Sequence, residues 1–133
     1  MDHLAPASFD DCIVALATGA APAGVAIVRL SGKSSLEVAR KLATLPDPMP
    51  VRQALLTKLA HARTKQPLDE ALVLYFQAPA SFTGEDVVEL QCHGGIRHVE
   101  QVLAAVRDAG ARAAEPGDRC CMAVVSSCRE MLG

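Results

Sequence analysis

The chain has 133 residues, of which half are apolar, and it carries a net charge of -2 at pH 7. This length and apolar content fit one domain around a single core and argue against disorder. A slightly acidic chain with three Phe, one Tyr and no Trp lacks the basic field and the aromatic surface that nucleic-acid-binding modules use.

The first half of the chain predicts two strands followed by a helix. Apolar runs of strand length occupy residues 12–17 and 25–30, with a Gly, Ala and Pro loop between them. Ser34 and Glu37 have the spacing of a capping box, so a helix is expected to begin at Ser34. Four apolar residues then repeat at helical spacing: Val38, Ala39, Leu42 and Leu45. Prolines from Pro46 onward are expected to end this helix.

The second half predicts three strands, a longer helix and a short last strand. Residues 54–62 and 71–76 read as strands joined by a polar turn at 63–69. Another strand ends at a Gly-Gly pair, a helix is expected over 96–109, and 111–114 form a final strand. The core face of that helix is predicted to consist of Ile96, Val99, Val102, Leu103 and Val106. The order β-β-α-β-β-β-α-β predicts an α+β fold with two helices packed on one sheet.

The strand before the Gly-Gly pair alternates between apolar and polar residues. One face receives Val88, Leu90 and Cys92, and the other receives Glu89, Gln91 and His93. A strand face with three such groups is either solvated or lines a polar site. The alternation favours neither reading.

Four segments of the chain share a specific pattern. Residues 81–95 read SFTGEDVVELQCHGG, residues 11–18 read DCIVALAT, residues 24–32 read GVAIVRLSG and residues 110–117 read GARAAEPG. In this order and spacing they resemble the N-terminal, tetrahydrofolate-binding domain of the bacterial and organellar tRNA-modification GTPases of the MnmE (TrmE) family. The resemblance implies a mixed sheet of about five to six strands with two helices packed on it.

The resemblance places an MnmE-like domain at 1–117 and an atypical tail at 118–133. The loop at 19–24 lacks an arginine that the family usually carries, and a family lysine downstream of position 120 has no counterpart. The break after Gly117 indicates a truncation or a reading-frame change. The helical domain, the GTPase domain and the C-terminal cysteine motif of the family are not found in this chain.

The family resemblance implies that Arg29 and Glu89 contact 5-formyltetrahydrofolate or another one-carbon tetrahydrofolate. One carboxylate can accept the neighbouring N–H and amino groups of a pterin, and an arginine fork can meet a pterin carbonyl or the glutamate tail of folate. The alternative is that both residues sit on a solvated sheet face, as most charged residues do. Without the family lysine, the pocket is expected to be incomplete and its affinity weak.

The resemblance also implies the wider function. Full-length family members form homodimers and modify carbon 5 of the wobble uridine in tRNA together with a flavoprotein, and their GTP hydrolysis requires potassium. We expect no catalytic residue and no GTP hydrolysis in this chain alone. The alternative from a different class is a pure dimerisation or interaction module without a cofactor. No basic n-region precedes an apolar run and no apolar stretch reaches about 18 residues, so a cytoplasmic chain without a membrane span is expected.

Other motifs are interpreted as structural. Gly32-Lys33-Ser34 lacks the first glycine of a phosphate-binding loop, which would stand at Ile27, and is expected to be a helix start. Cys92 and His93 point to opposite strand faces and cannot form a dyad. The cysteines at 120, 121 and 128 lack zinc-ligand spacing, so a metal or thiol enzyme is disfavoured. The basic run Lys58, His61, Arg63 and Lys65 is interpreted as the solvated end of a hairpin.

Overall fold

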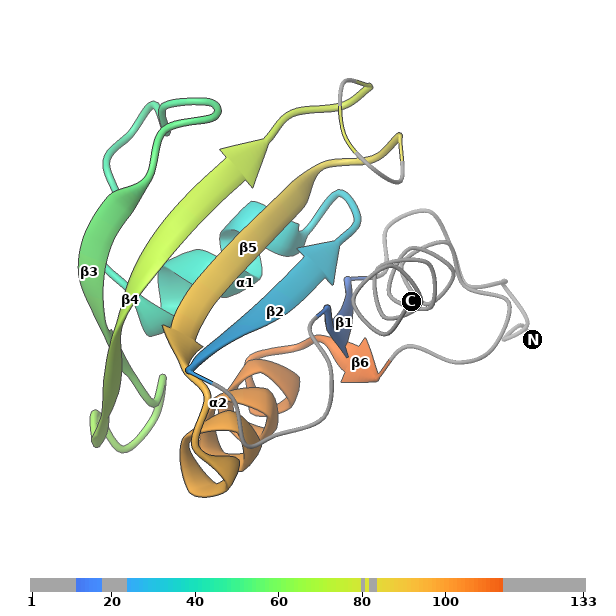
Figure 1. The fold of residues 1–133 in the computed structure, drawn as a ribbon. Coiled ribbons are helices and arrows are strands. Elements are labelled where there is room, and N and C mark those ends of the chain that lie inside the picture. The colour runs from blue at the N-terminus through green and yellow to red at the C-terminus, as the bar shows by residue number, and fades with distance from the viewer. Residues whose placement is uncertain (1–11, 18–23, 80, 82–83, 114–133) are drawn as a thin grey trace.

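The structure is a computed structural model that describes residues 12–17, 24–79, 81 and 84–113 (Figure 1). Its elements are β1 (Ile13–Leu16), β2 (Val25–Ser31), α1 (Ser35–Leu42), β3 (Leu55–Ala60), β4 (Pro67–Phe76), β5 (Val87–His93), α2 (Ile96–Asp108) and β6 (Arg112–Ala113). The predicted order of strands and helices is confirmed. No helix in the described part of the chain is long and apolar enough to cross a membrane.

The strands of the described residues form one mixed sheet in the order β3-β4-β5-β2-β1-β6. Neighbouring strands are antiparallel except β1 and β6, which pair in parallel. Figure 1 shows α1 behind the strands and α2 below them, and both helices contribute side chains to one buried apolar cluster. The expected α+β fold, a mixed sheet with two helices on it, is therefore confirmed.

The core lies between this sheet face and the two helices. The central strands β2 and β5 contribute side chains that are no more than 1% exposed, namely Val28, Leu30, Val88 and Leu90. Val38 of α1 and Val102 of α2 belong to the same apolar cluster. Because side chains alternate along a strand, residues 29 and 89 must point to the opposite face. Neither of the two described helices packs on that face, and we call it the helix-free face.

Helix α1 begins and ends differently from its prediction. The side chain of Ser34 makes no capping hydrogen bond, and its φ of -91° and ψ of 5° are not the extended geometry that capping uses. The hydroxyl of Ser35 instead donates to the carbonyl of Asp86 at 3.2 Å. The helix stops at Leu42, before the prolines, because Ala43 is already extended with a φ of -145° and a ψ of 149°. Leu45 is nevertheless buried in the core, as its pattern predicted.

Helix α2 buries a stripe that differs from the predicted one at its edge. Val99, Val102 and Val106 are buried as expected, but Ile96 is 52% exposed. The stripe is rotated toward Ala105 and the following Ala109, both buried. These small side chains let the helix approach its neighbours closely, and Ile96 falls on the flank of the stripe. The assignment of Ile96 to the core was therefore wrong.

The β3–β4 hairpin turns more tightly than expected. Its loop is closed by two backbone hydrogen bonds, from His61 N–H to the Gln66 carbonyl and from Lys65 N–H to the His61 carbonyl, each 2.9 Å. Strand β4 then begins at Pro67, inside the segment predicted as turn. The polar residues Asp69 and Glu70 pair with β3 through their backbone, because the ladder uses main-chain groups and leaves the side chains to bond elsewhere or to face solvent.

Candidate functional site

The two residues expected to contact a cofactor face each other across the sheet. Arg29 of β2 and Glu89 of β5 are direct partners in the antiparallel register, although 60 residues separate them in the chain. Nε and Nη2 of Arg29 donate hydrogen bonds to Oε2 of Glu89 at 3.1 and 2.8 Å. The sequence pattern had placed each residue on a sheet face but not opposite the other.

Both side chains of this pair are buried on the face that the helices leave open. Arg29 is 4% exposed and Glu89 is 6% exposed. The alternative that they lie on a solvated sheet face was therefore wrong. Burying two charges costs hydration free energy, and their mutual attraction offsets this cost only in part. A buried ion pair therefore suggests a role in binding or in fixing the structure.

The pair lies in a row of four residues that crosses four strands. Its neighbours in register are Ala15 of β1, beside Arg29, and Leu74 of β4, beside Glu89. Both hydrogen bonds from Arg29 end on Oε2, so Oε1 of Glu89 is left to accept from another donor. A polar ligand resting on this row would meet a carboxylate oxygen and a guanidinium between apolar side chains.

Apolar side chains are exposed on the same face. By their register, Val25, Leu72 and Leu56 share the face of the ion pair, and they are 56%, 39% and 68% exposed. Exposed Leu and Val side chains on neighbouring strands form the kind of surface that proteins use for association.

His93 ends β5 on this face and is held by a residue that sequence reasoning assigned to a turn. Asp69 accepts a hydrogen bond from the His93 amide at 2.9 Å and contacts the ring Nδ1 at 2.7 Å. Burial tends to raise the pKa of Asp69, but the hydrogen bonds from His93 and from the Glu70 amide outweigh it and lower that pKa below the usual 3.8. The ring of His98 lies beside that of His93, with centroids 5.9 Å apart.

The other candidate motifs have structural roles. Cys92 points into the core, where burial raises the pKa of its thiol to about 11, so it is no nucleophile at neutral pH. The amide of Gly32 donates to the carbonyl of Asp86 and therefore does not point at a ligand. Within the described ranges, no group of three or more His, Cys, Asp or Glu side chains could hold a metal ion. The cysteines at 120, 121 and 128 lie outside these ranges.

Comparison with known proteins identifies the family. Residues 12–126 match the family model described as GTP-binding protein TrmE N-terminus. The chain belongs to this family. The match runs past Gly117, and the residues around that position lie outside the described part of the chain, so the expected domain boundary there stays a prediction.

Curated relatives carry the name tRNA modification GTPase MnmE. The chain is 48% identical to the protein of that name from a Nitratiruptor species over 106 residues, which cover 80% of this chain and 23% of the relative. It is 49% identical over 111 residues to that of Aromatoleum aromaticum, covering 84% and 24%. The chain corresponds to the N-terminal domain of these TrmE proteins and spans about a quarter of their length.

Proposed function

We propose that this TrmE N-terminal chain binds a one-carbon tetrahydrofolate, such as 5-formyltetrahydrofolate, on the row that contains Arg29 and Glu89. The observation that carries the proposal is the burial of this ion pair on a sheet face that neither α1 nor α2 covers. Packing alone does not require a buried ion pair, because apolar residues of similar volume often stabilise a fold equally well. The pair therefore points to a role in binding.

The residues present fit a pterin. Oε1 of Glu89, which is not used by Arg29, can accept from the ring N–H or the amino group, and Oε2 keeps a second lone pair. The Arg29 guanidinium supplies donors for a pterin carbonyl or for the carboxylates of the folate tail. Leu74 and Ala15 flank the pair in register and offer apolar contact to the ring faces. When bound, the cofactor would supply the one-carbon unit.

The affinity should be low. The family resemblance implies a third contact from a lysine beyond position 120, and residues 118–133 hold no lysine. Losing one charge-assisted hydrogen bond costs about 1.5–3 kcal/mol, or roughly ten- to hundredfold in affinity.

We further propose that the helix-free face forms a homodimer. Its exposed residues Val25, Leu56 and Leu72 are supporting evidence, because water contact with large apolar side chains is removed on association. The alternative function, a dimerisation or interaction module without cofactor, rests on the same surface and differs only in the role of the ion pair.

The activity proposed for the whole protein rests on the names of its relatives, which give tRNA modification and GTPase activity, and for its details on the family resemblance. A longer protein containing this domain would act in the cytoplasm on carbon 5 of the wobble uridine of tRNA, as a potassium-dependent GTPase with a flavoprotein partner. Neither GTP nor potassium has a proposed site in this chain. The isolated chain should therefore release no phosphate when it is incubated with GTP.

Calorimetry with 5-formyltetrahydrofolate tests the cofactor proposal. Wild type is compared with the double variant Arg29→Leu/Glu89→Leu, which replaces the ion pair by apolar side chains and is expected to stay folded. Glu70→Gln, an exposed change on β4, serves as the matched control. We expect weak saturable heat from wild type and from the control, and none from the double variant.

Two outcomes would reject folate binding at this row. One is equal affinity of wild type and a folded double variant, which would remove Arg29 and Glu89 from the site. The other is no heat from wild type at millimolar ligand, which would favour the interaction module.

A further inference from the structure

A second feature lies on the opposite side of the molecule, where α1 ends beside the β3–β4 hairpin. A cavity of about 420 Å³, open to solvent, lies between the last turn of α1 with its following loop and strand β3 with its turn. Its size is within the range of small-molecule sites. It shares no lining residue with the row around Arg29 and Glu89.

Four cationic residues line this cavity: Arg40, Lys41, Lys58 and Lys65. They are four of the 13 Lys and Arg in a chain whose net charge is -2. Among the described residues that line it, none is Asp or Glu. Positively charged groups around a cavity repel one another, and an anion bound in the cavity reduces that repulsion.

Nearby carboxylates do not neutralise this group. Asp47 reaches only 4.0 Å from Nη2 of Arg40, and its side chain is 91% exposed. Asp108 is engaged by His61 and Arg63, at 3.1 and 3.9 Å. Glu70 of β4 stands opposite Lys58 in register, but within the described residues no ion pair joins Lys58 or Lys65 to an acid.

The rim of the cavity is held in place by hydrogen bonds. Arg40 donates to the carbonyls of Leu45 and Pro46 at 3.0 and 2.8 Å, and Lys41 donates to the carbonyl of Ala109 at 2.9 Å. These bonds also cover carbonyl oxygens of the loop after α1 and of the end of α2, which would otherwise repel an anion.

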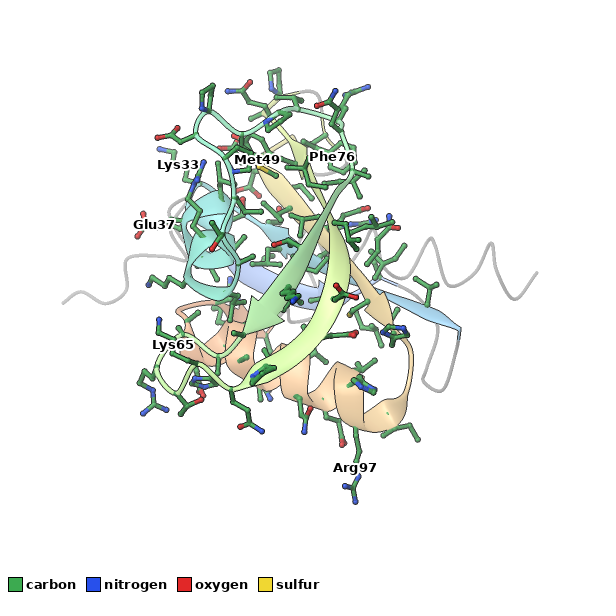
Figure 2. The ribbon with its side chains drawn as sticks, turned by 90° about the vertical axis from the view of Figure 1, so that its left-hand side faces the viewer. Lys33, Glu37, Met49, Lys65, Phe76 and Arg97 are labelled. Atoms are coloured by element: carbon green, nitrogen blue, oxygen red, sulfur yellow. The ribbon has the colours of Figure 1, made fainter. Side chains whose placement is uncertain are left out.

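The hairpin turn is anchored as well. Nδ1 of His61 accepts the amides of Arg63 and Thr64, at 3.2 and 3.4 Å, so the ring proton lies on Nε2 and is donated to Asp108 of α2. Lys65 therefore extends from a turn that is tied to a helix. Figure 2 shows Lys65 on this turn, on the side of the molecule where α1 lies.

We infer that this cavity binds the phosphate group of a small molecule, with Arg40, Lys41, Lys58 and Lys65 around the anion. The ammonium group of lysine is a compact cation on a flexible side chain and can approach the charge of a phosphate. The guanidinium of arginine can donate two parallel hydrogen bonds to it. The volume leaves room for an ester portion beside the phosphate.

Binding is tested by titrating the chain with inorganic phosphate at low ionic strength and following backbone amide signals by NMR. We expect saturable shifts confined to residues 40–45 and 58–65. The variant Lys58→Gln/Lys65→Gln removes two exposed cations and should weaken binding at least about tenfold, equivalent to about 1.4 kcal/mol. Arg97→Gln is the matched control, because Arg97 extends into solvent from α2 in Figure 2, away from the cavity, and it should bind as wild type does.

Parallel titrations separate possible sources of the anion. Ribose 5-phosphate binding more tightly than inorganic phosphate would assign a phosphate ester, and equal affinity would assign the free anion. The inference is overturned if no amide shift saturates in the millimolar range, or if the double variant retains wild-type affinity. A short RNA duplex that binds far more tightly than both small anions, through the same lysines, would overturn the small-molecule assignment in favour of a nucleic acid.

Discussion

Asp69 accepts two hydrogen bonds from one residue, His93, through the backbone amide and through the ring. The carboxylate side chain is only 7% exposed, whereas the imidazole is 68% exposed. These two bonds hold the last residue of β5 against the start of β4. Because its pKa is lowered, the ionised form of Asp69 stabilises the fold.

Stability should therefore depend on Asp69 in a defined pH range. Its contribution is fully present above the usual pKa of 3.8 and is lost as pH falls further through the lowered pKa of the folded state. We expect Asp69→Asn to lower the free energy of unfolding by about 1–3 kcal/mol at pH 7. Urea unfolding at pH 7 and in acid below pH 3.8 should show that this loss shrinks in acid. The exposed Glu70→Gln is the control, and a pH-independent loss would contradict the assignment.

The ion pair predicts non-additive effects on stability. Glu89→Gln leaves the Arg29 guanidinium buried without its counter-charge, which should cost about 3–5 kcal/mol. The double change Arg29→Leu/Glu89→Leu removes both charges and should be close to neutral or stabilising. Urea denaturation of the two variants measures the difference. A double variant less stable than Glu89→Gln would show that the charges themselves hold the sheet together.

Backbone strain at Lys65 gives a third prediction. Its φ is 63°, in the left-handed region that costs a residue with a β-carbon about 1–2 kcal/mol relative to glycine. We expect Lys65→Gly to be more stable than Lys65→Ala by about 1 kcal/mol, since both lose the charge and only glycine relieves the strain. The two melting temperatures should differ by several degrees. Equal values would mean that the loop relaxes without cost.

The helix-free face predicts a homodimer at micromolar concentration. Leu56, 68% exposed on β3, should tolerate glutamate in a monomer but not inside a dimer interface. We expect Leu56→Glu to shift sedimentation equilibrium from about twice the 14.0 kDa chain mass toward the monomer. Val51→Glu, a change at a 42% exposed residue outside the strands, should remain dimeric. A wild type that sediments only as monomer would rule the dimer out.

The sequence by itself predicted the element order and, for the strand over residues 87–93, which side chains share a face. Alternation over residues 87–93 and helical spacing over residues 99–106 are local signals, because they follow from the geometry of one strand or one helix. Local signals also place Arg29 and Glu89 on polar strand positions. Local signals did not predict the exposure of Ile96. That exposure depends on the rotation of α2 about its axis, which is set by the packing of Ala105 against its neighbours.

Only the tertiary structure decided which distant residues meet. Register between β2 and β5 brings Arg29 to Glu89, and packing of the hairpin on α1 brings Lys58 and Lys65 to the cavity lined by Arg40. These contacts arise from pairing between segments far apart in the chain, which no short window of sequence contains. Burial of the ion pair belongs to the same class, since the exposure of a side chain is set by everything that packs around it.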